Sequence, residues 1–217
     1  IIETTSGNTG FSLAMVSMIK GYNCILAVTS KSSEDKINML RSMGAQVHVC
    51  PANVKADDAR SYYQVAKRLH SEIKESIYIN QYFNDLNVEA HYLTTGPEIW
   101  EQTGGKVTHF VSAMGTTGTI TGVSRYLKSQ NKAVQIIGAQ PSEGSRIPGI
   151  RKWPEAYLPK IYDASNVDAL RLVSQDDAEE MCRRLAREEG IFAGISAAGA
   201  AHVALELSKE VENATII

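Results

Sequence analysis

Apolar and polar residues alternate along the chain in two rhythms, one typical of buried strands and the other of amphipathic helices. The helical rhythm is clear over residues 11–20, where apolar side chains recur at helical spacing until Gly21 ends the pattern. The expected helices are residues 11–20, 33–43, 57–73, 94–103, 120–130, 176–190 and 197–211. The expected strands are residues 1–5, 23–29, 46–50, 76–80, 108–114 and 134–140.

Two segments break this alternation. Residues 81–92 match neither rhythm and are interpreted as a loop, and residues 141–159 form an excursion rich in proline and glycine. Elsewhere strands alternate with helices, a pattern that predicts parallel sheets with helices on both faces. We expect an α/β protein of two doubly wound parallel-sheet domains with a ligand cleft between them. Residues 1–85 would be a smaller movable domain and residues 86–217 a larger one, both incomplete.

Composition narrows the class of partner. With 22 Lys and Arg against 24 Asp and Glu, the net charge of −2 predicts no nucleic-acid or anionic-membrane surface. No apolar run approaches the roughly 18 residues that span a bilayer. Cys24, Cys50 and Cys182 are widely spaced and odd in number, which favours reduced thiols in a cytoplasm. Neither cysteines nor histidines have metal-ligand spacing, so we expect no metal site and a small-molecule partner.

Two glycine-containing loops connect a strand to a helix, at the places where doubly wound sheets bind ligands. The loop at 115–119, GTTGT, combines glycines that allow close backbone approach with threonine hydroxyls, and it suits a monophosphate. The loop at 5–10, TSGNTG, offers hydroxyls and an amide at a helix start, which suits a carboxylate. A plain structural turn and a helix N-cap remain open for these loops on spacing alone.

The two loops occur in this order with TTGPEIW at 94–100 between them and EGIFAGIS at 189–196 after them. Together these segments resemble the fold-type II pyridoxal-phosphate (PLP) enzymes, whose fold is like that of the tryptophan synthase β-subunit. Within them the chain is similar to the cysteine synthases (O-acetylserine sulfhydrylases), and residues 94–130 and 146–159 look most like the B isozyme. The resemblance implies PLP as cofactor and β-replacement of O-acetyl-L-serine by sulfide or thiosulfate.

Roles of individual residues follow from this resemblance. The residues implied to bind substrate are Thr5, Ser6, Thr9, Gln81, Arg151 and Lys152. The residues implied to bind the cofactor are Asn8, Gly115, Thr116, Thr117, Gly118, Thr119 and Ser196. Arg151 and Lys152 would attract an anionic sulfur donor, although a solvated loop is the competing interpretation.

Ser196 carries a chemical argument of its own. The resemblance places its hydroxyl beside the pyridine nitrogen, where a neutral group draws electrons into the ring less strongly than a carboxylate would. Weaker delocalisation favours prompt loss of a leaving group from Cβ. On sequence alone Ser196 would be interpreted as a helix N-cap.

The family's Schiff-base lysine lies upstream of the TSGNTG loop, in a segment resembling NPxGSxKDR that this chain lacks. We therefore expect that lysine before Ile1, the chain to be an internal piece of a longer protein, and the catalytic residue to be unknown here. The resemblance also suggests a homodimer and a serine acetyltransferase as a possible partner.

Two alternatives remain. Residues 51–69 and 80–92 look closer to the cystathionine β-synthase branch, so a β-synthase of that type stays open. A catalytically silent protein that binds a phosphorylated metabolite is the alternative from another class.

Overall fold

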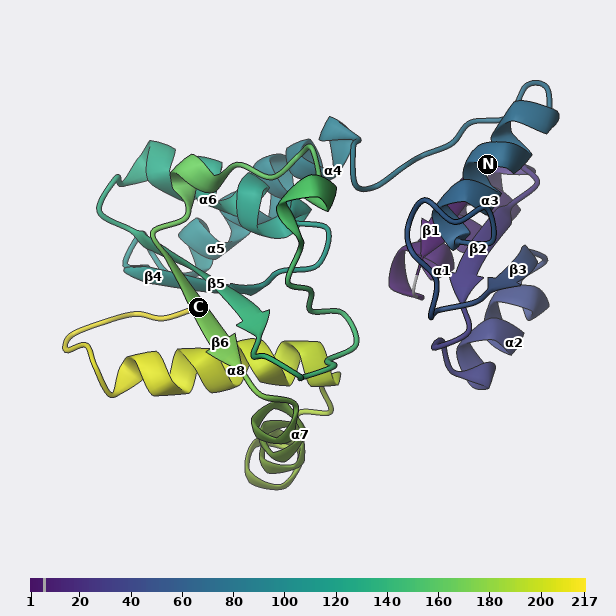
Figure 1. Cartoon of the computed structure of the whole chain (residues 1–217). Coiled ribbons are helices and arrows are strands. Elements are labelled where there is room, and N and C mark those ends of the chain that lie inside the picture. The colour runs from purple at the N-terminus through teal and green to yellow at the C-terminus, as the bar shows by residue number, and fades with distance from the viewer. Residues whose placement is uncertain (6) are drawn as a thin grey trace. The chain divides into compact units, whose positions relative to one another are not determined.

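The computed structural model describes residues 1–5 and 7–217, with the side chain of Ala156 left out. The chain divides into two compact units, Ile1–Gln81 and Tyr82–Ile217. Each unit contains a three-stranded parallel sheet. The expected α/β class with parallel sheets and helices is confirmed (Figure 1). The movability of the first part of the chain stays a prediction.

The first unit has strand order β1-β2-β3, and its helices follow the strands in turn. Its elements are β1 (Ile2–Thr5), α1 (Asn8–Lys20), β2 (Ile25–Thr29), α2 (Glu34–Ser42), β3 (Gln46–Cys50) and α3 (Tyr62–Glu72). α1 ends at Gly21, whose φ of 72° is left-handed, as the sequence predicts. α3 begins later than expected, because Ser61 is its N-cap and accepts a hydrogen bond from Gln64 N.

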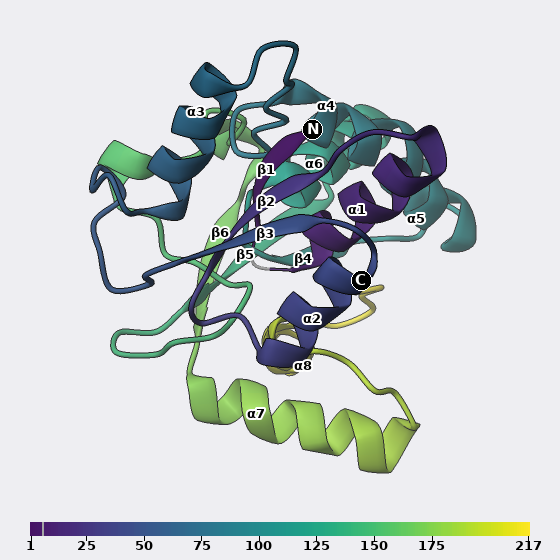
Figure 2. The same cartoon turned by 90° about the vertical axis from the view of Figure 1, so that its right-hand side faces the viewer.

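Helices cover both faces of this sheet, so it is doubly wound (Figure 2). On one face Leu26 and Val28 of β2 pack with residues of α1 and α2 such as Ala14 and Leu40. On the other face Ile2 and Ala27 pack against α3. Two of the three cysteines, Cys24 and Cys50, lie in these cores, are free, and are 5% and 4% exposed. Burial raises the pKa of both thiols.

The second unit has strand order β4-β5-β6. Its strands are β4 (His109–Ala113), β5 (Gln135–Pro141) and β6 (Ala169–Val173). Its helices are α4 (Asp85–Ala90), α5 (Gly96–Gln102), α6 (Gly118–Gln130), α7 (Gln175–Arg184) and α8 (Ile195–Ser208). Shorter helical turns lie at His91–Thr95, Glu155–Tyr157, Ala164–Asn166 and Leu185–Glu189.

The interpretation of residues 81–92 as a loop was wrong. α4 occupies its centre, with Asn84 as N-cap, and a π-helical turn, His91–Thr95, continues it into α5. A six-residue helix whose buried residue is Val88 is too short to show an amphipathic period.

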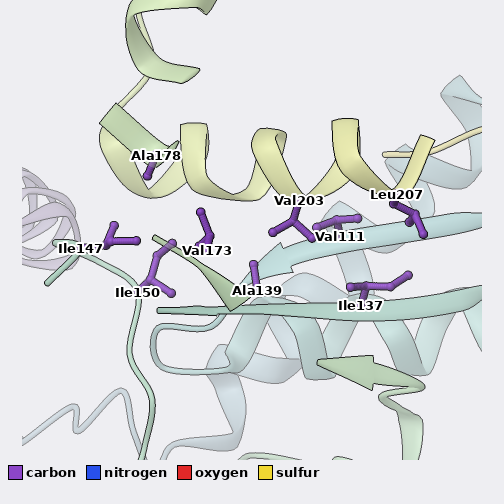
Figure 3. Packing of buried hydrophobic residues seen from close by; sticks show 9 residues of the cluster. All are labelled: Val111, Ile137, Ala139, Ile147, Ile150, Val173, Ala178, Val203 and Leu207. Carbon is purple, nitrogen blue, oxygen red and sulfur yellow. The ribbon is translucent and has the colours of Figure 1, made fainter. Parts of the chain in front are cut away.

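Two hydrophobic clusters again fill both faces of the sheet. Figure 3 shows α8 laid across the strands, with Val203 and Leu207 directed toward Val111 and Ile137. On the opposite face Phe110 and Ile136 pack against α6 through Val123 and Leu127. α8 and α6 therefore lie on opposite faces of the second sheet.

A single parallel bridge extends each sheet beyond its first strand. Tyr78 pairs with Ile2 beside β1, and Ile216 pairs with His109 beside β4. The expected strand at 76–80 is therefore reduced to this bridge. Strand order reverses at these two places, and in open α/β sheets ligands bind at the carboxyl ends of strands where the order reverses.

Candidate functional site

The first candidate site is the loop between β1 and α1, which we call the carboxylate loop (residues 5–10). Thr5 Oγ1 accepts hydrogen bonds from Gly7 N at 3.0 Å and from Gly10 N at 3.1 Å. Gly7 precedes α1 with φ of 146°, and a Cβ on Gly10 would lie 2.5 Å from Thr5 Cγ2. The hydroxyl of Thr5 is therefore engaged with the backbone and gives the loop its tight shape.

The carboxylate loop meets the segment that follows the Tyr78 bridge. Thr9 Oγ1 donates to Gln81 Oε1 at 2.8 Å, and Gln81 Nε2 donates to the carbonyl oxygen of Thr4 at 2.8 Å. The structure thus brings together Thr5, Thr9 and Gln81 of the predicted substrate-binding residues. Asn8 is exposed as the first residue of α1. Ser6 lies outside the described residues.

Two charged residues that the sequence analysis did not single out lie at this loop. Glu3 on β1 is fully buried, and desolvation raises the pKa of its carboxyl to about 7 although Thr4, Gln81 and Asn80 donate hydrogen bonds to it. Lys36 on α2 lies over the loop, since a Cβ on Gly7 would be 3.2 Å from Lys36 Cδ and 3.6 Å from Nζ. The signal for Glu3 was a carboxylate in a predicted strand, between Ile2 and Thr4; such a residue is almost never fully buried unless it is paired.

The second candidate site is the loop between β4 and α6, which we call the phosphate cup (residues 115–119). Thr117 adopts φ of 72°, an uncommon left-handed value for a β-branched residue, and α6 begins at Gly118. The Thr117 hydroxyl is buried and has no hydrogen-bond partner among the described residues. A strained turn with an unsatisfied hydroxyl at the start of a 13-residue helix is typical of an anion site.

α4 and the turn after it hold the phosphate cup in place. Asn87 Nδ2 donates to Thr116 Oγ1 at 3.1 Å, and a Cβ on Gly118 would lie only 2.1 Å from Asn87 Oδ1. The ring nitrogens of His91 lie 3.1 Å from Thr119 Oγ1 and 2.9 Å from Thr95 Oγ1. Burial lowers the pKa of His91, which favours its neutral form. These supports escaped the sequence analysis because they lie in the segment interpreted as a loop.

The excursion at 141–159 returns to the phosphate cup. Trp153 Nε1 donates to Gly115 O at 2.8 Å, and a Cβ on Gly115 would lie 3.0 Å from Gly149 O. Gly149 itself has φ of 94°, and a Cβ there would lie 2.9 Å from Ser196 Oγ. The structure therefore assembles the start of the cup, Gly149 and Ser196 within the second unit. Ser196 is the second residue of α8, whose N-cap is Gly194, so the N-cap interpretation of Ser196 was wrong.

Arg151 and Lys152 have different surroundings. The Arg151 guanidinium lies 5.0 Å from the ring centroid of Trp153 and 5.9 Å from that of Tyr82, a cation–π arrangement. Lys152 is exposed. Among the described residues, the cation–π contacts with Tyr82 and Trp153 belong to Arg151.

The residues of the phosphate cup fit the phosphate ester of PLP. The unsatisfied hydroxyl of Thr117 and the backbone amides at the start of α6 are hydrogen-bond donors for its oxygens. Within the described residues no group of three His, Cys, Asp or Glu side chains is arranged to hold a metal ion. The described helices also include none with the length and apolarity of a membrane span.

Comparison with known proteins identifies the family. The family model "Pyridoxal-phosphate dependent enzyme" matches residues 1–217. The chain is 54% identical to cysteine synthase B of Pseudomonas aeruginosa, covering 100% of the chain and 71% of the relative. It is 46% identical to cysteine synthase B of Escherichia coli, covering 100% of the chain and 70% of the relative.

More distant matches agree with these. The cystathionine β-synthase of Oryctolagus cuniculus is 37% identical over 98% of this chain and 41% of its own length. The crystal structure of O-ureido-L-serine synthase superimposes with a TM-score of 0.89 at 30% identity, over 99% of this chain and 69% of that one. The chain therefore belongs to the family of pyridoxal-phosphate dependent enzymes.

Proposed function

We propose that the protein is a PLP-dependent cysteine synthase of the B type. The observation that carries the proposal is the 54% and 46% identity, over the whole chain, to two relatives named cysteine synthase B. In the reaction the bond from Cβ to the acetyl ester oxygen of O-acetyl-L-serine breaks, acetate leaves, and a bond from Cβ to sulfur forms. Sulfide gives cysteine, and thiosulfate gives S-sulfocysteine.

The carboxylate loop would bind the amino-acid substrate. Thr9 and Gln81 already form a hydrogen-bonded pair at the start of α1, where backbone N–H groups favour an anion. We propose that Thr5, Ser6, Thr9 and Gln81 hold the substrate carboxylate, with Thr5 shaping the loop through Gly7 and Gly10. This arrangement would fix the orientation of the substrate's Cα and Cβ. Such positioning raises the reaction rate, because the bonds that break at Cα and Cβ must be aligned.

The phosphate cup would bind the cofactor. Gly115, Thr116, Thr117, Gly118 and Thr119 would hold the phosphate ester, Asn8 the ring's 3′ oxygen, and Ser196 the pyridine nitrogen. When bound, PLP supplies an electron sink that makes the substrate's α-proton acidic and its β-substituent a leaving group. The neutral Ser196 hydroxyl would limit how strongly the pyridine ring withdraws electrons from the substrate.

Further assignments are part of the same proposal. Arg151 and Lys152 would attract the anionic sulfur donor. A homodimer and a serine acetyltransferase are the proposed protein partners. The cytoplasm is the proposed location, supported by three free cysteines.

The test is an assay of the complete PLP-loaded enzyme with O-acetyl-L-serine and either sulfide or thiosulfate. The proposal expects cysteine or S-sulfocysteine and a shift of the cofactor's visible absorbance when O-acetyl-L-serine is added without a nucleophile. A parallel assay with serine and homocysteine tests a cystathionine β-synthase. Turnover in that assay alone would replace the proposal, and no absorbance shift with any β-substituted alanine would end it.

A further inference from the structure

Glu3 occupies an unusual place for a carboxylate. It lies on β1 between β2 and the Tyr78 bridge, two residues before the carboxylate loop, and its side chain is fully buried. Burying a carboxylate costs free energy unless hydrogen bonds replace its water, and a fully apolar residue of similar size is often no less stable at such a place.

The two oxygens of Glu3 join segments that are far apart in the sequence. Oε1 accepts from Thr4 N at 2.6 Å and from Thr4 Oγ1 at 3.1 Å, while Oε2 accepts from Gln81 N at 3.2 Å. Thr4 belongs to the strand that leads into the carboxylate loop. Gln81 follows the Tyr78 bridge on the other side of β1. One carboxylate therefore fixes the strand end and the Gln81 backbone relative to each other.

Gln81 passes this placement on to the carboxylate loop. Its side chain is held at both ends, because Nε2 donates to Thr4 O and Oε1 accepts from Thr9 Oγ1, each at 2.8 Å. Thr4 therefore orients the side-chain amide of Gln81, and this amide orients the Thr9 hydroxyl. Glu3 itself is fully buried and has no access to a ligand at the surface of the loop.

We propose that Glu3 is a positioning residue for substrate binding: its carboxylate holds the backbone of Gln81 so that Gln81 and Thr9 bind the substrate carboxylate as one unit. This inference rests on the proposed role of the carboxylate loop. Only an ionised carboxylate presents acceptors to all the donors of Thr4, Asn80 and Gln81, since an amide at this place turns its own NH₂ group toward one of them. A glutamine at position 3 would therefore displace Gln81 with little change in volume.

The test compares Glu3→Gln with wild type and with Glu72→Gln, an exposed carboxylate of the same unit that is paired with Arg68. We expect Glu3→Gln to raise KM for O-acetyl-L-serine roughly tenfold to a hundredfold, the cost of one disturbed charge-assisted hydrogen bond, with kcat changed far less. The dissociation constant of L-alanine, an amino acid without a leaving group, should rise by the same factor when titrated through the cofactor absorbance. Glu72→Gln should change neither constant.

A double-mutant cycle separates positioning from mere stability. If Glu3 acts through Gln81, Glu3→Gln combined with Gln81→Ala should bind L-alanine no more weakly than Gln81→Ala alone. Additive losses, or an unchanged dissociation constant in Glu3→Gln, would overturn the inference. Should Glu3→Gln not fold, Thr4→Val removes the hydroxyl donor to Glu3 and should weaken L-alanine binding about threefold; no weakening would count against Glu3.

The outcomes also separate this inference from the proposed function. L-Alanine binding depends on PLP and on the carboxylate loop but on no β-replacement. A wild-type enzyme that binds L-alanine yet makes no cysteine would end the proposed function and leave the inference about Glu3 fully testable.

Discussion

Thr9 and Gln81 are 72 residues apart in the chain, yet the Thr9 hydroxyl donates to the Gln81 side-chain oxygen at 2.8 Å. The contact exists because Tyr78 pairs with Ile2, which places the end of that segment beside the end of β1. Two polar side chains at adjacent strand ends thus present one surface to a ligand.

Replacing Gln81 tests that surface. Gln81→Ala removes the partner of Thr9 and should raise KM for O-acetyl-L-serine roughly tenfold or more, because a substrate carboxylate loses an oriented donor. Steady-state kinetics of the complete enzyme measure the effect, with Gln64→Ala on the neighbouring α3 as the control. Equal effects of the two variants would show that Gln81 has no specific part in binding.

Thr117→Val should move stability and cofactor affinity in opposite directions. The valine removes a buried hydroxyl that has no partner among the described residues, so the cofactor-free protein should gain about 1 kcal/mol of unfolding free energy. The dissociation constant of PLP should rise roughly fivefold to tenfold, because a donor to the phosphate is lost. Urea unfolding and fluorescence titration give the two values. A more stable protein with unchanged PLP affinity would remove Thr117 from the phosphate site.

Gly118→Ala should weaken PLP binding through a clash at the base of the phosphate cup. The new Cβ would lie 2.1 Å from Asn87 Oδ1, so Asn87 must move and release Thr116. A loss of about 1–3 kcal/mol of PLP binding free energy is expected, measured by equilibrium titration. In the background Asn87→Ala, the same substitution should cost much less, since the clashing side chain is gone. An undiminished cost there would indicate strain in the α6 backbone instead.

The raised pKa of Glu3 predicts a pH dependence of stability. Between the ordinary value of 4.5 and about 7 the folded protein binds more protons at Glu3 than the unfolded chain does, so its stability falls as pH rises through this window. The full loss is roughly 3 kcal/mol, from 1.36 kcal/mol for each pKa unit. Tyr78, the titratable group near Glu3 through Thr4, has its pKa raised to about 12 by desolvation and does not titrate in this range.

Urea unfolding at several pH values from 4.5 to 8 measures this dependence. Glu3→Gln should flatten the profile relative to wild type, and Glu72→Gln should keep the wild-type slope. A wild-type profile parallel to that of Glu3→Gln would mean that Glu3 does not titrate near 7. The prediction has a functional side, because the ionised form that costs stability is the form that presents acceptors to Thr4 and Gln81.

The sequence predicted best those features that depend on neighbouring residues in the chain. Strand-to-helix loops at 5–10 and 115–119 follow from local periodicity and glycine content, and each connects a strand to a helix as expected. The helices begin earlier than expected, α1 at Asn8 and α6 at Gly118. The supports from Asn87 and His91 could not be predicted, because α4 is too short for a helical period. The meeting of Gly149 with Ser196 depends on how an irregular excursion returns to the sheet, which no local pattern encodes.

Glu3 illustrates a different limit. Its position inside a predicted strand was visible in the sequence, but its role depends on a donor from Gln81, 78 residues later. Pairing of the segment at 76–80 with β1 sets that contact. The sequence predicts a strand there but not the strand beside which it lies.

The deep burial of Cys24 and Cys50 affects how readily the sulfur compounds of the proposed reaction could modify these two thiols. S-Sulfocysteine, the product expected from thiosulfate, reacts with accessible protein thiolates: the thiolate attacks the sulfur bonded to Cβ, sulfite leaves, and a mixed disulfide forms. Thiols enclosed in apolar cores and kept protonated are poor participants in such exchange. The packing that fills the first sheet would therefore also protect this polypeptide from chemical modification by the sulfur compounds it would process.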